Sequence, residues 1–128
     1  MNERNAELQL IKDTVNLYVE GFRTGNIEMM KKAFHPRAMM YGTSAKSVTV
    51  VEIEGLYAFA AANKPPSETG EPQQCFITSV RYAGHAASVE MIEESSYGSD
   101  YTNYFQLLKI EGKWLIVSKT FNATVPNK

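Results

Sequence analysis

The sequence predicts an α+β fold in which three helices precede a mostly antiparallel sheet. Apolar residues before Pro65 recur every three or four positions, which is the spacing of amphipathic helices. From Gln73 onward the period changes to two, as in strands with one buried face. Only Glu111 and Gly112 separate the last two strand-like segments, and such a short connection with glycine is typical of a β-hairpin.

The first predicted helix carries one continuous apolar stripe. Its members, at spacings of three and four, are Leu8, Ile11, Val15, Tyr18, Val19 and Phe22. The helix should end in the sequence TGN, because Gly25 suits the left-handed residue that follows a helix. Asn26 in turn suits the N-cap of the next helix.

A short second helix is expected over residues 27–34, and a strand over residues 38–43. The inward-facing set of the helix is Ile27, Met30, Ala33 and Phe34. The helix should stop at His35, since Pro36 disfavours helical backbone angles in the residue before it.

The third helix is expected to start at Thr49, because Thr49 and Glu52 match a capping box and Val48 can pack on Ile53. Pro65 and Pro66 should close it, and residues 67–72 should form a surface loop.

Four strands are expected after residue 73. Alternating residues of the first are Phe76, Thr78, Val80 and Tyr82, and one face of the second carries Ala87, Val89 and Met91. Around that second strand Glu90, Glu93 and Glu94 are expected mainly on a solvated face, with Glu90 the candidate to point inward. The last two strands, residues 101–110 and 113–121, are apolar on both faces, and three helices can cover only one face of a sheet. We therefore expect a second copy of the chain on the outer face, in a two-fold homodimer.

Composition bounds the class of protein. A chain of 128 residues is sufficient for a single domain over residues 1–128. With 13 Lys+Arg against 14 Asp+Glu, the charges balance, so we expect no nucleic-acid partner. No apolar run is long enough to span a membrane and Cys75 is the sole cysteine, so a structural thiol and a cytoplasmic location are expected. The two histidines lie far apart without clustered ligands, and we expect neither a metal nor another cofactor.

The chain resembles the nuclear transport factor 2-like superfamily, which includes ketosteroid isomerase and the polyketide cyclases, and is most similar to its putative lumazine-binding group. The resemblance rests on Tyr18, Gly21, Gly25, Asn26, Phe34, His35, Pro36, Gly112, Trp114, Ile116, Val117, Lys119 and Phe121. It covers nearly the whole chain and implies a cone-shaped, curved sheet wrapped around the three helices, with a pocket at the open end. Relatives often carry aspartate where this chain has Asn103, which cannot titrate but can orient a ligand.

Residues on the expected inward faces are the candidates for the ligand pocket. They are Tyr18, Phe22, Phe34, His35, Met39, Tyr41, Tyr57, Asn103, Phe105, Lys119 and Phe121. No catalytic residue is assigned among them.

Several candidates have more than one interpretation. Tyr18 can point its phenol at a ligand or be a core tyrosine bonded to a backbone carbonyl. His35 can act as a base, although a role at the end of a helix is favoured. Met39 and Tyr41 share one strand face and can fill either core or pocket. Lys119 alternates with apolar neighbours, so it should bind an anionic group, pair with a carboxylate such as Asp100, or emerge at the rim.

Two functions follow. The first is a protein that binds an unidentified small molecule, and that can act as a cofactor-independent isomerase, dehydratase or cyclase on a small cyclic or aromatic compound. The second is a dimeric accessory or interaction module whose cone is filled by its own side chains.

Overall fold

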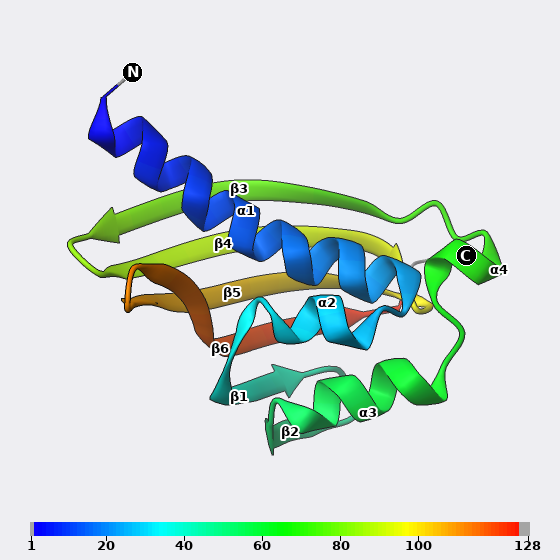
Figure 1. Ribbon diagram of the computed structural model, residues 1–128. Helices are drawn as coiled ribbons and strands as arrows, with labels where there is room; N and C mark the ends of the chain where they lie inside the picture. The colour runs from blue at the N-terminus through cyan, green and yellow to red at the C-terminus, as the bar shows by residue number, and fades with distance from the viewer. Residues whose placement is uncertain (1, 126–128) are drawn as a thin grey trace.

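The computed structural model describes residues 2–125 and shows helices on one side of a single six-stranded sheet (Figure 1). The helices are α1 (Glu3–Thr24), α2 (Ile27–Lys31), α3 (Glu54–Ala62) and α4 (Pro66–Thr69). The strands are β1 (Phe34–Thr43), β2 (Val48–Glu52), β3 (Gln74–Ala83), β4 (Ala86–Ser96), β5 (Ser99–Ile110) and β6 (Lys113–Thr124). This is the predicted α+β class.

The strand order in the sheet is β2-β1-β6-β5-β4-β3. All neighbouring strands are antiparallel except β1 and β6, which are parallel. Register shifts interrupt four of the five pairings, and such bulges bend strands and increase their twist. The sheet is consequently curled and open.

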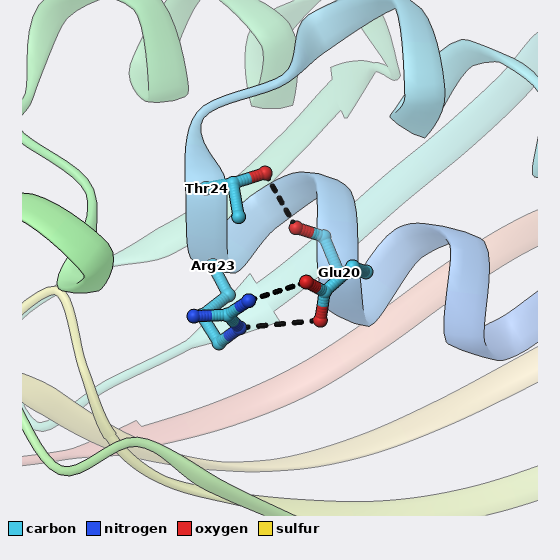
Figure 2. Close-up of polar contacts among 3 residues, drawn as sticks. All are labelled: Glu20, Arg23 and Thr24. Atoms are coloured by element: carbon cyan, nitrogen blue, oxygen red, sulfur yellow. Dashed lines mark hydrogen bonds and ion pairs between the residues drawn. The ribbon is translucent and has the colours of Figure 1, made fainter.

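Helix α1 has the ends that the sequence predicts. Gly25 is left-handed (φ 72°) and its N–H donates to the Gly21 carbonyl, and the Asn26 side chain caps α2 by accepting from the Met29 N–H. Figure 2 shows the last turn, where Arg23 donates from two guanidinium nitrogens to the Glu20 carboxylate. The Thr24 hydroxyl donates to the Glu20 carbonyl at 2.7 Å. These exposed contacts hold the surface of α1 and stand apart from the core.

The second predicted helix is too long. It stops at Lys31, and Phe34 with His35 already belongs to β1. Tertiary pairing prevails here, because the Ile116 N–H of β6 donates to the Ala33 carbonyl at 2.8 Å and Phe34 lies beside Ile116 in the parallel ladder.

The predicted start of the third helix is wrong. Residues 48–52 form β2, which pairs with β1, and α3 begins at Glu54 without a side-chain cap. The run of Val48, Thr49, Val50 and Val51 is β-branched throughout, and such residues favour strands when a partner edge is available. The expected loop at 67–72 also differs, because its first residues belong to the short α4.

The final hairpin forms as predicted. Ile110 and Lys113 pair directly across a two-residue turn in which Glu111 (φ 50°) and Gly112 (φ 80°) are both left-handed. Tight turns of this kind match the natural twist of the strands, so the hairpin fixes the register of β5 against β6.

The core lies between α1 and the inner face of the sheet. Its buried members include Ile11, Val15, Phe105, Leu107 and Ile116. Near the start of α1, the Glu7 carboxylate accepts from the Trp114 indole N–H at 2.8 Å and from the Lys109 ammonium at 2.7 Å. This end is filled and pinned, whereas the other end of the sheet is open.

Candidate functional site

An open hollow of about 1040 Å³ lies between α3, the β1–β2 connection and the last half of β6. Aromatic side chains make up much of its wall: Tyr18, Phe22, Phe59, Tyr101 and Phe121. The size and the apolar character are those of sites that bind small organic molecules.

Lys119 lies in this wall, on the inner face of β6. Its side chain is only 2% exposed, and its Nζ is 4.3 Å from the centre of the Phe121 ring. Two further rings flank the same Nζ, Tyr18 at 5.5 Å and Tyr101 at 5.8 Å. Within residues 2–125 no carboxylate forms an ion pair with Lys119. Pairing with Asp100, one of the alternatives for Lys119, is therefore wrong, and the Asp100 carboxylate accepts the Ser95 N–H instead.

Burial lowers the pKa of the Lys119 ammonium to about 8, while the charge of Glu93 acts in the opposite direction. A lysine with this pKa has an appreciable fraction of free amine near neutral pH. The aromatic faces replace part of the lost hydration through cation–π attraction, which keeps the charged form accessible as well. The group can therefore serve as either a cation or a nucleophile.

Glu93 organises a polar network beside this lysine. The Glu93 side chain is fully buried on β4, and its Oε1 accepts from the Tyr18 hydroxyl and the Asn103 amide, both at 2.7 Å. Its Oε2 accepts from the Gln73 amide at 3.3 Å, and Gln73 also donates to the Ser96 hydroxyl. Three donors thus hold a carboxylate in the interior, which satisfies the general requirement for a buried charge.

Tyr18 connects the network to the hollow. Its ring lines the hollow, and its hydroxyl donates to Glu93, which is not part of the lining. Burial, reinforced by the neighbouring Glu93 charge, raises the pKa of Tyr18 well above its ordinary value. The phenol therefore stays neutral and serves as a hydrogen-bond donor to Glu93.

A glycine makes room for Phe121, which lies in the wall of the hollow. Gly42 on β1 lies beside Phe121 on β6, and a Cβ on Gly42 would fall 2.0 Å from the Phe121 ring. The ring occupies the space that any other residue at position 42 would need. Gly42 thereby lets Phe121 lie where its face meets the Lys119 ammonium.

The structure separates the predicted pocket residues into three groups. Those in the wall of the hollow are Tyr18, Phe22, Lys119 and Phe121. Those in the core or in the network behind the wall are Phe34, Asn103 and Phe105, with Tyr57 half-buried against the Phe34 ring. The remaining three, His35, Met39 and Tyr41, are on β1 outside the wall.

On β1 the inward residue is Met40, which lines the hollow, while Tyr41 is 37% exposed. The sequence alternation separates the two faces of this strand, but the face that meets the hollow depends on pairing with β6. His35 follows Phe34 on the strand, and its Nδ1 accepts the Arg37 N–H at 3.0 Å. This contact is local to β1, and His35 does not lie at the end of a helix, because α2 already ends at Lys31.

Sequence reasoning missed Glu93. The expectation that Glu90 is the inward acid is wrong, since Glu90 contacts Thr78 while Glu93 is the buried one. The signal was present, because Glu93 lies two residues after Met91 and four after Val89, on the face already assigned inward. A buried acid so close to Lys119 could only be recognised by carrying that alternation one step further.

Two further features of residues 2–125 concern metal ions and membranes. No cluster of three or more His, Cys, Asp or Glu side chains suitable for a metal ion is found there. None of the described helices has the length and apolarity to cross a membrane.

The curled sheet, the helices on one side of it and the hollow at its open end define a nuclear transport factor 2-like protein. Within this superfamily the chain belongs to the family described as putative lumazine-binding, whose profile matches residues 6–122.

Three relatives illustrate the similarity. A nuclear transport factor 2-like protein of unknown function from Shewanella baltica has a TM-score of 0.87 and 27% identity, with 99% of this chain and 100% of that one covered. A ketosteroid isomerase-like protein from Erwinia carotovora atroseptica has a TM-score of 0.70 and 16% identity, with 98% and 100% covered, and so shares the fold. The aldolase FrzH from Cladobotryum sp is 28% identical over 120 residues, which is 93% of each chain.

Proposed function

We propose that the protein binds a small cyclic or aromatic compound that carries a carbonyl or anionic oxygen, and that it promotes a cofactor-independent reaction at the carbon next to the oxygen-bearing one. Isomerisation, dehydration, cyclisation and aldol-type carbon–carbon chemistry all belong to this class. The observation that carries the proposal is one buried cation, Lys119, in the aromatic wall of a hollow large enough for such a ligand.

The chemistry of the wall supports this ligand class. Flat apolar rings pack well against aromatic side chains, and an oxygen of the ligand can reach Lys119. When the reacting carbon lies next to a carbonyl group, these reactions build negative charge on the carbonyl oxygen in the transition state. A preorganised donor in a site with little water stabilises such charge strongly, and Lys119 is in that position.

Known relatives support the same class. The names of two similar proteins, ketosteroid isomerase-like and aldolase, refer to reactions that pass through an enolate or its equivalent. The hollow also argues against the alternative of a cone filled by its own side chains.

A screen of cyclic ketones, aromatic aldehydes, phenolates and heterocycles by thermal shift tests the proposal. Saturable stabilisation by one class is expected, since a ligand that binds only the folded state raises its stability. The stabilisation should disappear in Tyr101→Ala, which removes one wall, and persist in Tyr41→Ala, on the opposite face of the sheet. A screen without any saturable hit, or equal loss in both variants, would refute the proposed binding.

We further propose that two copies associate through the outer sheet face, as the sequence predicts. Exposed apolar residues on strands β1, β3 and β5 support this: Tyr41, Phe76, Tyr104 and Leu108. Light scattering should give twice the mass of one chain at micromolar concentration, and a single-chain mass would contradict the association. A cytoplasmic location likewise stays a prediction.

A further inference from the structure

Lys119 is unusual in having neither of the two ordinary surroundings of a lysine, water or a carboxylate. Its side chain is 2% exposed, and three aromatic rings surround its Nζ. The acids of the neighbouring strands have other partners, since Asp100 accepts from the Ser95 N–H and Glu93 from Tyr18, Asn103 and Gln73. An ammonium needed only for fold stability would be expected to have a counter-ion.

The amine nevertheless faces a place where a ligand can enter. Lys119 lines the open hollow, and so do residues 44–47 of the β1–β2 connection, of which Ala45, Lys46 and Ser47 are exposed to solvent. Desolvation without a counter-ion is the arrangement that activates a lysine as a nucleophile.

We propose that Lys119 is the nucleophile of this site and forms a Schiff base with the carbonyl carbon of the ligand. The proposal rests on the proposed function, and it narrows the ligand to aldehydes and ketones. Carboxylates and phenolates would be bound by the same residue without reaction.

The step balances without an external reagent. The lone pair of the neutral Lys119 amine forms a C–N bond to the carbonyl carbon, and the C=O π electrons move to oxygen, which takes up a proton. Loss of that oxygen as one water leaves a protonated imine, so the net change consumes one proton and releases one water. The positive nitrogen then draws electrons from the adjacent carbon, which acidifies its C–H bond or weakens the bond to a β-hydroxylated carbon.

The surroundings suit both halves of the step. A pKa of about 8 leaves part of the amine unprotonated near neutrality, as attack requires. The aromatic faces then stabilise the cationic imine as they stabilise the ammonium. The titratable groups that face Lys119 are Tyr18 from α1, Glu93 from β4 and Tyr101 from β5, and burial raises the pKa of both phenols. Glu93 is therefore the neighbour whose charge opposes deprotonation.

Reductive trapping tests the inference. The intact protein is treated with benzaldehyde or cyclohexanone and sodium cyanoborohydride at about pH 8, near the pKa of Lys119. The hydride converts the imine into a stable secondary amine, which intact-mass and peptide-mapping measurements locate. We expect Lys119 to be alkylated at least about ten-fold faster than exposed lysines, because a lysine of ordinary pKa is almost fully protonated at this pH.

Matched variants make the result specific. Lys119→Arg keeps the cation but cannot form the imine, so the fast adduct should vanish while circular dichroism remains that of the wild type. Lys113→Met removes an exposed lysine of the same strand that lies outside the wall of the hollow, and it should leave the fast adduct intact. Alkylation of Lys119 no faster than of Lys113 in the wild-type protein would overturn the proposal, whatever the variants do.

A non-reactive probe separates this inference from the proposed function. Benzyl alcohol has the ring of benzaldehyde without its carbonyl, and its binding is measured by thermal shift. Saturable binding of ring compounds with slow Lys119 alkylation would refute the Schiff base and leave the binding pocket standing. Fast, selective alkylation of Lys119 without saturable binding of any ring compound would support the role of Lys119 as a nucleophile. It would refute the proposed function, which is the binding of a cyclic or aromatic compound.

Discussion

Two lysines on neighbouring strands of the same hairpin have opposite surroundings. Lys109 on β5 is 23% exposed and donates to the Glu7 carboxylate at 2.7 Å, a contact that ties α1 to the sheet at the filled end. Lys119 on β6 is almost fully buried at the open end, among three rings and without an ion pair within residues 2–125. The first lysine is placed where its charge supports the fold. The second is placed where its charge costs stability, which is a common property of functional groups.

Removal of the buried acid should have the largest effect. Glu93→Ala leaves the Tyr18 hydroxyl and the Asn103 amide without their acceptor in the interior. We expect a loss of about 3–5 kcal/mol in the free energy of unfolding, measured by urea denaturation. Glu94→Ala, at the exposed position next to it, should change the midpoint little. Similar midpoints for the two variants would contradict the hydrogen-bond network around Glu93.

Replacement of each lysine by methionine should change the stability of the protein in opposite directions. Lys119→Met removes a buried ammonium and should stabilise the protein at pH 7 by on the order of 3 kcal/mol, the equivalent of a pKa lowered from 10.5 to about 8. Lys109→Met breaks the contact with Glu7 and should destabilise modestly. Thermal melts of both variants beside the wild type provide the measurement. Destabilisation by both would remove the contrast between the two ends.

The pH dependence of that gain is a separate check. Because the folded pKa of Lys119 lies below the unfolded value, the unfolded chain binds more protons between about pH 8 and pH 10.5, and wild-type stability gains with rising pH. The advantage of Lys119→Met should be full below about pH 8 and should shrink toward pH 10.5. The tyrosines are common to both proteins, so the difference between their denaturation curves isolates the lysine. If the extra stability of Lys119→Met did not change with pH, the lowered pKa of Lys119 would be contradicted.

A smaller effect is expected at Gly42, which makes room for the Phe121 ring in the wall of the hollow. Gly42→Ala puts a methyl group against the Phe121 ring, and the ring must move. We expect a loss of about 1–3 kcal/mol, as for other overpacked sites, together with slower alkylation of Lys119 by benzaldehyde. Gly84→Ala has open space around it and tests the cost of a left-handed glycine alone. Unchanged alkylation in Gly42→Ala would show that Phe121 does not position the amine.

Features with short-range causes could be predicted from the sequence. The end of α1 at Gly25, the Asn26 cap and the turn at Glu111 and Gly112 each depend on residues a few positions apart, and the structure confirms them. The prediction of where α3 starts was wrong because it depends on a contact that is distant in the sequence. Its capping-box pattern was equally compatible with a β-branched strand, and only the edge of β1 decided between them.

The candidate site could be predicted only in part, for the same reason. Lys119 stood out because a charge alternated with apolar neighbours, but its cage is assembled from α1, β5 and β6, which no local pattern brings together. Strand alternation shows which neighbours share a face with Met40 and with Glu93. Which of the two faces points to the hollow depends on the order of the strands in the sheet.

The position of β6 has a consequence for synthesis of the protein on the ribosome. This strand is the last of the six to emerge, yet it lies between β1 and β5 near the middle of the sheet. A nascent chain that lacks it has two separate sheet fragments with unpaired edges, and it has no Lys119. The Lys119 amine therefore enters the site in the same step that joins the two fragments of the sheet. An incomplete chain has no finished site in which this amine is exposed.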